Sequence, residues 1–163
     1  MKDYMSIPEY VIAPQHGISL EVAEKIRKYH TFPMNILRNK LGFPIRVSQR
    51  SGYRHEEHEL SKGRALTSAH LFREIPARQD PGYGAADYSV DDENWSVFIR
   101  ELIEARIYPR LIFYPNSKFV HADYRYLGVD RFFYIMEDGI KRVSELTFIE
   151  KVELTFTPQT NTD

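Results

Sequence analysis

The clearest periodic segment of the chain runs from about residue 93 to residue 106. Its apolar residues recur three and four positions apart, which is the spacing of a helix that buries one face. An earlier helix is predicted over residues 19–29, and another over residues 33–40, which we expect to stop at Gly42. The polar segment 55–62 predicts a short helix that faces solvent.

After Pro109 the pattern becomes extended, because short runs of β-branched and aromatic residues alternate with turn residues. These runs predict strands over residues 110–114, 118–124, 131–136 and 140–144, with turns at 114–118 and 137–139 and an earlier short strand at 43–48. Helices come first and strands mostly later. The expected fold class is therefore α+β, with N-terminal helices packed on a mostly antiparallel sheet.

A chain of 163 residues is long enough for one domain with a proper core and short for two. We place that domain at residues 1–156 and expect the polar tail 157–163 to be disordered. Hydrophobic residues make up 42% of the chain and charged residues 28%, which is an ordinary composition for a soluble protein. We expect a monomer.

Charge and hydropathy exclude two broad classes of partner. A net charge of −1 argues against a nucleic-acid-binding surface. No run approaches the ~18 apolar residues of a membrane span. The first residues also lack the apolar segment of a signal peptide, so we expect the protein to be cytoplasmic as synthesised.

The chain contains no cysteine. Disulfides, thiolate zinc sites and cysteine nucleophiles are thereby excluded, and any transition-metal site must be built from histidines and carboxylates. Two distant stretches offer that ligand set: one runs from His70 to Asp87, and the other is Phe-Val-His-Ala-Asp, which contains His121 and Asp123. In a strand the last two side chains point to the same face. Together the stretches predict a hydrolytic zinc centre.

The motifs follow one another in a characteristic order: Ser-Gly-Tyr-Arg at 51–54, Ser-x-His at 68–70, Gly-Ala-Ala-Asp at 84–87, Tyr-Pro at 114–115 and Phe-Val-His-Ala-Asp at 119–123. This series resembles the M15 family of zinc peptidases, the D-Ala-D-Ala carboxypeptidases and L-Ala-D-Glu endolysins that share their fold with Hedgehog signalling domains. The resemblance covers most of the chain. It implies a small α+β domain with one zinc ion that cleaves peptide bonds in peptidoglycan stem peptides, as a carboxypeptidase or as an endopeptidase.

The resemblance makes His70, Asp87 and His121 the zinc ligands. Three protein ligands leave a fourth position for water, whose pKa zinc lowers to about 7. Asp123 is the candidate general base or the residue that orients His121. In the alternative assignment Asp123 itself binds the metal and His121 transfers protons. Arg54 matches the family's substrate arginine, which pairs with a peptide carboxylate.

Ser51 and Ser68 are expected to close turns around the site. The chain departs from the family at one place, since the first histidine and the aspartate lie seven positions apart in the family and seventeen apart here. We expect the extra residues, 73–82, to bulge as a surface loop, because loop-closure entropy grows only as the logarithm of length. In a less favourable alternative His70 is displaced and Asp80 takes its place.

The lengthened loop also leaves open a second function, in which a catalytically impaired protein of this fold binds the cell wall or serves in a phage particle. A third alternative is a regulatory or scaffolding protein whose histidines and aspartates are incidental. An enzyme without a signal peptide reaches the wall through a holin, a phage tail or lysis. The resemblance therefore favours a phage or prophage origin.

The remaining histidines and aromatic residues have plainer interpretations. The segment from His55 to His58 is not an HExxH motif and reads as a solvated helix rather than a metal site. His16 and His30 have no partner in register and are expected at the surface. Five aromatic residues are expected mainly in the strand core, with one of them open to a place in the cleft: Tyr124, Tyr126, Phe132, Phe133 and Tyr134.

Overall fold

The computed structural model describes residues 5–12, 14–128 and 130–157. The α-helices are α1 (Leu20–Ile26), α2 (Phe32–Leu41), α3 (Glu56–Ser61), α4 (Trp95–Glu104) and α5 (Glu145–Phe156). The strands are β1 (Arg46–Val47), β2 (Glu74–Ile75), β3 (Asp80–Pro81), β4 (Ala85–Ser89), β5 (Arg110–Tyr114), β6 (Phe119–Asp123), β7 (Phe132–Glu137) and β8 (Gly139–Val143). Short 3-10 turns cover Ile7–Tyr10, Pro14–His16, Ser48–Arg50, Ala69–Leu71, Pro76–Arg78 and Asp92–Asn94. The tail was predicted at 157–163; Thr157 is described and its backbone N–H bonds to Glu153 at the end of α5, whereas residues 158–163 lie outside the described residues.

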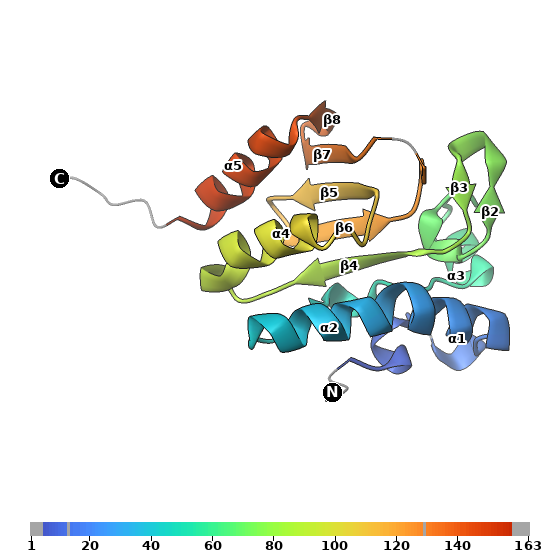
Figure 1. The fold of residues 1–163 in the computed structure, drawn as a ribbon. Helices are drawn as coiled ribbons and strands as arrows, with labels where there is room; N and C mark the ends of the chain where they lie inside the picture. The colour runs from blue at the N-terminus through green and yellow to red at the C-terminus, as the bar shows by residue number, and fades with distance from the viewer. Residues whose placement is uncertain (1–4, 13, 129, 158–163) are drawn as a thin grey trace.

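One six-stranded sheet organises the domain, in the order β1-β4-β6-β5-β7-β8. Every neighbouring pair is antiparallel except β5 and β7, which run parallel. In Figure 1 the helices α1 and α2 lie along the β4 side of the sheet. The helices α4 and α5 lie nearer to the β8 side. The expected α+β class, with a mostly antiparallel sheet in a single small domain, is confirmed.

The hydrophobic core lies between one face of this sheet and the helices α1, α2, α4 and α5. Alternation along the strands sends Leu111 and Phe113 of β5 to that face, where both are buried. The Phe113 ring packs 5.7 Å from the Trp95 ring of α4, and Phe133 of β7 packs 5.3 Å from Phe148 of α5. The polar residues that alternate with these are left on the opposite face of the sheet.

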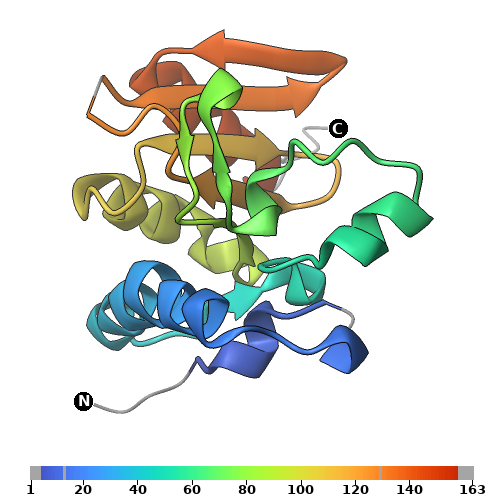
Figure 2. The ribbon, with the colours of Figure 1, turned by 90° about the vertical axis from the view of Figure 1, so that its right-hand side faces the viewer.

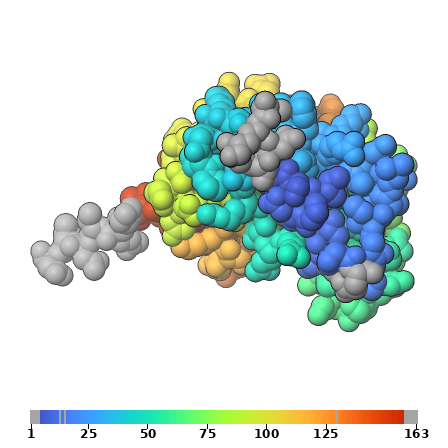
Figure 3. Space-filling view, turned by 90° about the horizontal axis from the view of Figure 1, so that it is seen from below, coloured from blue at the N-terminus to red at the C-terminus, as the bar shows by residue number. Residues whose placement is uncertain are grey.

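The two N-terminal helices form one nearly continuous helical run. A π-helical turn, Arg27–Thr31, joins α1 to α2, and the run ends at Gly42, whose φ of 77° is left-handed. The wider turn lets the run continue into Pro33, which cannot donate a backbone hydrogen bond. Seen from below in Figure 3, this helical layer and the N-terminal turns cover the surface.

Four regular elements were not predicted from the sequence: β4, α5 and the two short strands β2 and β3. The segment predicted as a surface loop, residues 73–82, is an antiparallel hairpin in which β2 pairs with β3. Figure 2 shows this hairpin standing in front of the sheet. Among the described residues, no helix combines the length and the apolar run that crossing a lipid bilayer requires.

Candidate metal centre

Three buried side chains from different parts of the chain meet at one point. His70 lies in the turn Ala69–Leu71, Asp87 on β4 and His121 on β6. Nδ1 of His121 lies 2.8 Å from Oδ1 of Asp87 and 3.2 Å from Nε2 of His70, and that Nε2 lies 3.6 Å from the same Oδ1. These atoms form a group that can hold a metal ion. The three residues predicted as ligands are thus brought together.

Pairing between strands places two of the three. Asp87 and His121 are directly opposite each other on β4 and β6, so their side chains leave the same face of the sheet. The backbone N–H of Asp87 also donates to the carbonyl of Ser51 at 2.8 Å, which ties β4 to the segment 51–54. The sheet therefore presents a carboxylate and an imidazole at a single position.

The third side chain comes from a turn that its own residues close. The Ser68 hydroxyl accepts the backbone N–H of His70 at 3.3 Å, and Phe72 ends the turn with a left-handed φ of 54°. The carbonyl of His70 accepts the N–H of Arg54 at 2.9 Å. The predicted turn-closing role of Ser68 is confirmed, and the turn aims the His70 ring at β6.

Neighbouring acceptors determine which ring nitrogens carry protons. Nδ1 of His70 lies 2.6 Å from the carbonyl oxygen of Gly52, which can only accept, so this nitrogen is the donor. Nε2 of His121 donates in the same way to Oδ2 of Asp123 at 2.9 Å. In the neutral imidazoles, Nε2 of His70 and Nδ1 of His121 therefore carry lone pairs. Both lone pairs point toward Oδ1 of Asp87.

Three lone pairs facing one another repel unless a cation lies among them. Burial would lower the pKa of His121, but its hydrogen bonds with Asp123 and Asp87 outweigh this and raise the pKa to about 9. Burial would raise the pKa of Asp87, yet the neighbouring His70 and His121 hold that pKa well below its usual range. Burial lowers the pKa of His70. The pocket thus favours one positive charge at its centre, which a proton or a metal ion can supply.

Asp123 lies behind His121 rather than free in the site. It is fully buried, and both of its oxygens are hydrogen-bonded by Nε of Arg110, at 2.9 and 3.1 Å. Burial would raise the pKa of Asp123, but His121 and Arg110 hold it well below its usual range. An ionised carboxylate with both oxygens engaged suits the orienting role. The geometry gives less support to its acting as a general base or binding the metal directly.

Arg54 lies beside the Oδ2 oxygen of Asp87, whereas His70 and His121 lie beside Oδ1. Its guanidinium donates to the hydroxyl of Ser51 at 2.8 Å and lies 3.7 Å from Oδ2 of Asp87 and 3.8 Å from Oε1 of Glu59. Glu59 is buried and also pairs with Arg64 at 3.2 Å. About a fifth of the Arg54 side chain stays exposed. Its first contacts are therefore internal ones, and a limited part of it is open to a substrate.

Asp80 does not take the place of His70. It is buried in β3 of the hairpin, where its carboxylate accepts the backbone N–H of Gly82 at 2.9 Å and the guanidinium Nε of Arg125 at 3.1 Å. The group of converging ligand atoms contains His70 and not Asp80. The segment predicted as the extra loop, residues 73–82, thus forms the hairpin and leaves His70 in the candidate site.

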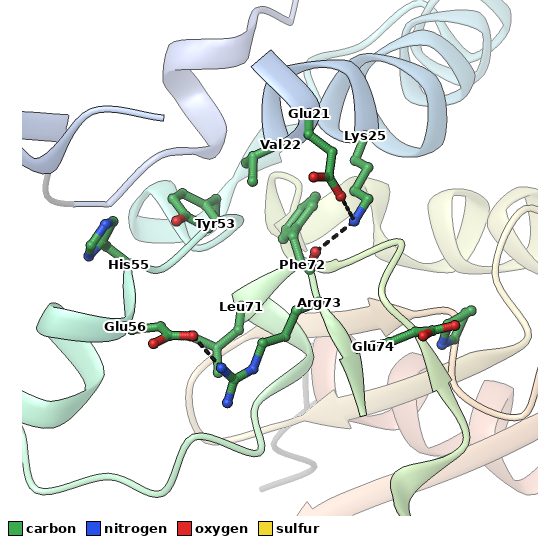
Figure 4. Close-up of a pocket in the computed structure, with 11 residues that line it drawn as sticks. Glu21, Val22, Lys25, Tyr53, His55, Glu56, Leu71, Phe72, Arg73 and Glu74 are labelled. Atoms are coloured by element: carbon green, nitrogen blue, oxygen red, sulfur yellow. Dashed lines mark hydrogen bonds and ion pairs between the residues drawn. The ribbon is translucent and has the colours of Figure 1, made fainter. Parts of the chain in front are cut away.

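No protein-family model, curated protein or solved structure matches the chain. What the site does must therefore be inferred from its own geometry. A pocket of about 550 Å³ lies nearby, lined by Tyr53, Leu71 and Phe72 among others, but not by the three converging side chains. In Figure 4 Lys25 is bound to Glu21, and Arg73 is bound to Glu56. This pocket is separate from the metal centre.

Two of the other expectations about histidines were wrong. His30, expected at the surface, is completely buried in the π turn, with Nδ1 3.1 Å from the Tyr108 hydroxyl and Nε2 3.0 Å from the Tyr83 carbonyl. His16 is exposed, as expected, but it is not without a partner, since it pairs with Glu57 at 3.1 Å beside the ring of His55. Those three side chains lie close enough to share an ion. However, Nδ1 of His55 already accepts the backbone N–H of Glu57 at the start of α3.

The sequence interpretation missed Arg110, which holds Asp123 in place. A signal was present: on a strand whose alternate residues are the core residues Leu111 and Phe113, an arginine shares a face with Ile112 and not with the core. Gly52 was also missed as the partner of His70. A Cβ at Gly52 would lie 2.5 Å from the carbonyl oxygen of Tyr10, so this position accepts only glycine without displacing its neighbours.

Proposed function

We propose that this protein is a zinc-dependent peptidase of the M15 type that hydrolyses peptide bonds in peptidoglycan stem peptides at the cell wall. One observation carries the proposal: two imidazole lone pairs and a carboxylate oxygen converge in a buried site, and partners outside the site fix both histidine tautomers. Two histidines and one carboxylate form a ligand set of hydrolytic zinc sites. The order of the motifs along the chain supports the family.

The residues present fit a zinc ion. Nε2 of His70, Nδ1 of His121 and Oδ1 of Asp87 would hold it, and the absence of cysteine leaves nitrogen and oxygen ligands alone. When bound, zinc supplies Lewis acidity toward a peptide carbonyl and toward water.

The chain's own residues prepare and maintain that ligand set. Asp123, held by Arg110, keeps the proton on Nε2 of His121, so that Nδ1 faces the centre as a lone pair. The Gly52 carbonyl does the same for His70. These are positioning roles. Arg54 lies near the second oxygen of Asp87, and its exposed part is our candidate for binding a substrate carboxylate.

Metal content and cell-wall digestion test the proposal together. Wild type should hold one zinc ion per chain, and His70→Ala, Asp87→Ala and His121→Ala should each weaken zinc binding by more than about 100-fold, the upper end of what outer-shell changes cost. The matched control is His58→Ala, which removes a histidine outside the site and should change nothing.

Elemental mass spectrometry gives the zinc stoichiometry, and liquid chromatography of muropeptides gives the cleavage. The proposal is wrong if wild type purified from zinc-containing medium carries no stoichiometric zinc. It is equally wrong if His70→Ala digests cell walls as well as wild type does.

The depth of the centre favours a second candidate function, a cell-wall-binding protein of the same fold that no longer catalyses. His70 is 3% exposed, Asp87 4% and His121 9%, so the approach to the ion is narrow. Zinc retained by the wild type, together with binding to purified walls and no cleaved muropeptide, would identify this function.

A further inference from the structure

The face of the sheet that carries the metal centre extends beyond it, across three more strands. Strand register aligns one residue from each strand in a single row: Asp87 on β4, His121 on β6, Ile112 on β5, Tyr134 on β7 and Arg142 on β8. Residues that pair directly project their side chains to the same face. Arg142 therefore shares a face of the sheet with the metal centre.

Arg142 is the cation at the β8 end of this row. It is exposed, and its side chain makes no hydrogen bond or ion pair within the part of the chain that the structure describes. Its guanidinium lies over the ring of Phe132, 4.2 Å from the centroid. By contrast, Arg110 on the same face is bound to Asp123, and Arg54 is bound to Ser51.

Contact with the aromatic ring prepares Arg142 to bind an anion. A guanidinium stacked on a ring is held in orientation by the cation–π attraction, while its N–H groups at the edge stay available. Those donors match the two oxygens of a carboxylate. Half-buried Tyr134 lies between Arg142 and Ile112 in the row, so a chain crossing toward the metal centre would pass over a phenol ring.

Strand spacing sets the distance between the two sites. Neighbouring strands lie about 4.8 Å apart, so the three steps from β6 to β8 separate the backbones of His121 and Arg142 by roughly 14 Å. An extended peptide advances about 3.4 Å per residue. A substrate that crosses the strands would span this distance with about four residues, or three where the arginine side chain reaches back.

We infer that Arg142 is a specificity-determining residue that binds a substrate carboxylate three to four residues from the scissile bond. The inference rests on the proposed peptidase function and sharpens it, because it requires an acidic peptide rather than any peptide. The metal centre acts on the bond, and Arg142 determines which peptides are held across the sheet.

Two synthetic peptides of one sequence test the assignment, with a carboxylate or a carboxamide at the position three or four residues from the cleaved bond. Zinc-loaded wild type should show a KM about 10-fold lower for the carboxylate peptide. Arg142→Gln should raise that KM about 10-fold, leave kcat within twofold, and leave the carboxamide peptide unaffected. Lys141→Gln is the matched control, since Lys141 is the adjacent cation and pairs with Ile135 on the other face.

Cleavage and binding are measured separately, the latter by fluorescence anisotropy of the labelled peptides on the same zinc-loaded proteins. Cleavage of both peptides with equal KM, or equal losses in Arg142→Gln and Lys141→Gln, overturns the Arg142 assignment alone. Binding that prefers the carboxylate and depends on Arg142, without cleavage, supports the assignment and overturns the peptidase. Binding with no preference for the carboxylate overturns the assignment.

Discussion

Two buried histidine sites lie in this domain, and they are built on opposite principles. His30 has one acceptor and one hydroxyl as partners, the Tyr83 carbonyl and Tyr108, so both of its nitrogens are satisfied within the protein. At the metal centre, His70 and His121 have each only one nitrogen satisfied from outside. Burial of a histidine alone is therefore no sign of a metal site. The sign is an imidazole whose remaining lone pair is directed at other ligands.

The surroundings of the two sites reinforce the contrast. Burial lowers the pKa of His30 to about 3, so this residue is neutral at physiological pH within a cluster of tyrosines. The pKa of His121 is raised to about 9 despite its burial, because two aspartates face it. The His30 site favours a neutral imidazole, whereas the candidate metal centre favours a positive charge. Three measurements would break or sharpen this comparison.

Removal of the metal by chelation should have the largest effect, a loss of thermal stability. A ligand that binds only the folded state stabilises it by about 4 kcal/mol when its free concentration is a thousand times Kd. For a domain of this size that corresponds to a fall of roughly 10 °C in Tm when EDTA removes the metal. Differential scanning fluorimetry should show this fall in wild type and in His30→Gln but not in Asp87→Ala. Equal curves with and without EDTA in wild type would contradict a metal at this site.

The next largest effect should be a pH dependence of the free energy of unfolding that arises from His30. Because its folded pKa, about 3, lies below the unfolded value near 6.5, the unfolded chain takes up the proton first. The contribution is fully present above pH 6.5 and is lost as the pH falls toward 3, amounting to about 3 kcal/mol by pH 4.5. Urea unfolding of metal-free wild type and His30→Gln should differ in slope over this window. Parallel pH profiles would show that the fold does not lower the pKa of His30.

The smallest effect should be the loss of metal affinity on changing Asp123, which lies behind His121. Asp123→Asn keeps the shape of the side chain but removes the charge that holds the proton on Nε2 of His121. Outer-shell changes of this kind typically cost 10- to 100-fold in metal affinity, so zinc should still bind, but more weakly. Competition with a chromophoric chelator measures the change. A loss as complete as that of Asp87→Ala would mean instead that Asp123 is itself a ligand.

Local patterns were enough for much of the fold. The α4 segment was predicted because its apolar stripe repeats over three turns, and β5 was predicted with the bounds that the structure has. In contrast, α5 was missed because Leu146 and Leu154 are exposed, which blurs the stripe formed by its buried residues. Strand β4 was missed because its two alanines give little strand signal by themselves, and its conformation depends on pairing with β6.

The residues of the candidate site could be predicted from the sequence, but the role of each residue could not. His121 and Asp123 lie two apart on a strand, so their common face followed from the sequence. Their division of labour did not, because it depends on Arg110, thirteen positions before Asp123 along the chain. The interior position of His30 depends in the same way on Tyr108, which lies seventy-eight positions away. Contacts over such separations leave no periodic trace in the sequence.

The hairpin between the candidate ligands His70 and Asp87 separates them along the sequence but not in space. Gly82 lies so close to Arg73 and Glu74 that a Cβ there would approach their backbone atoms to 2.7 and 2.6 Å, so the insertion leaves and returns at nearly one point. Its far strand is joined to the end of β6 through Arg125 and Asp80. The hairpin residues therefore connect the two segments that carry the candidate ligands Asp87 and His121. Their tip can vary in length or composition while the spacing of the ligands stays the same.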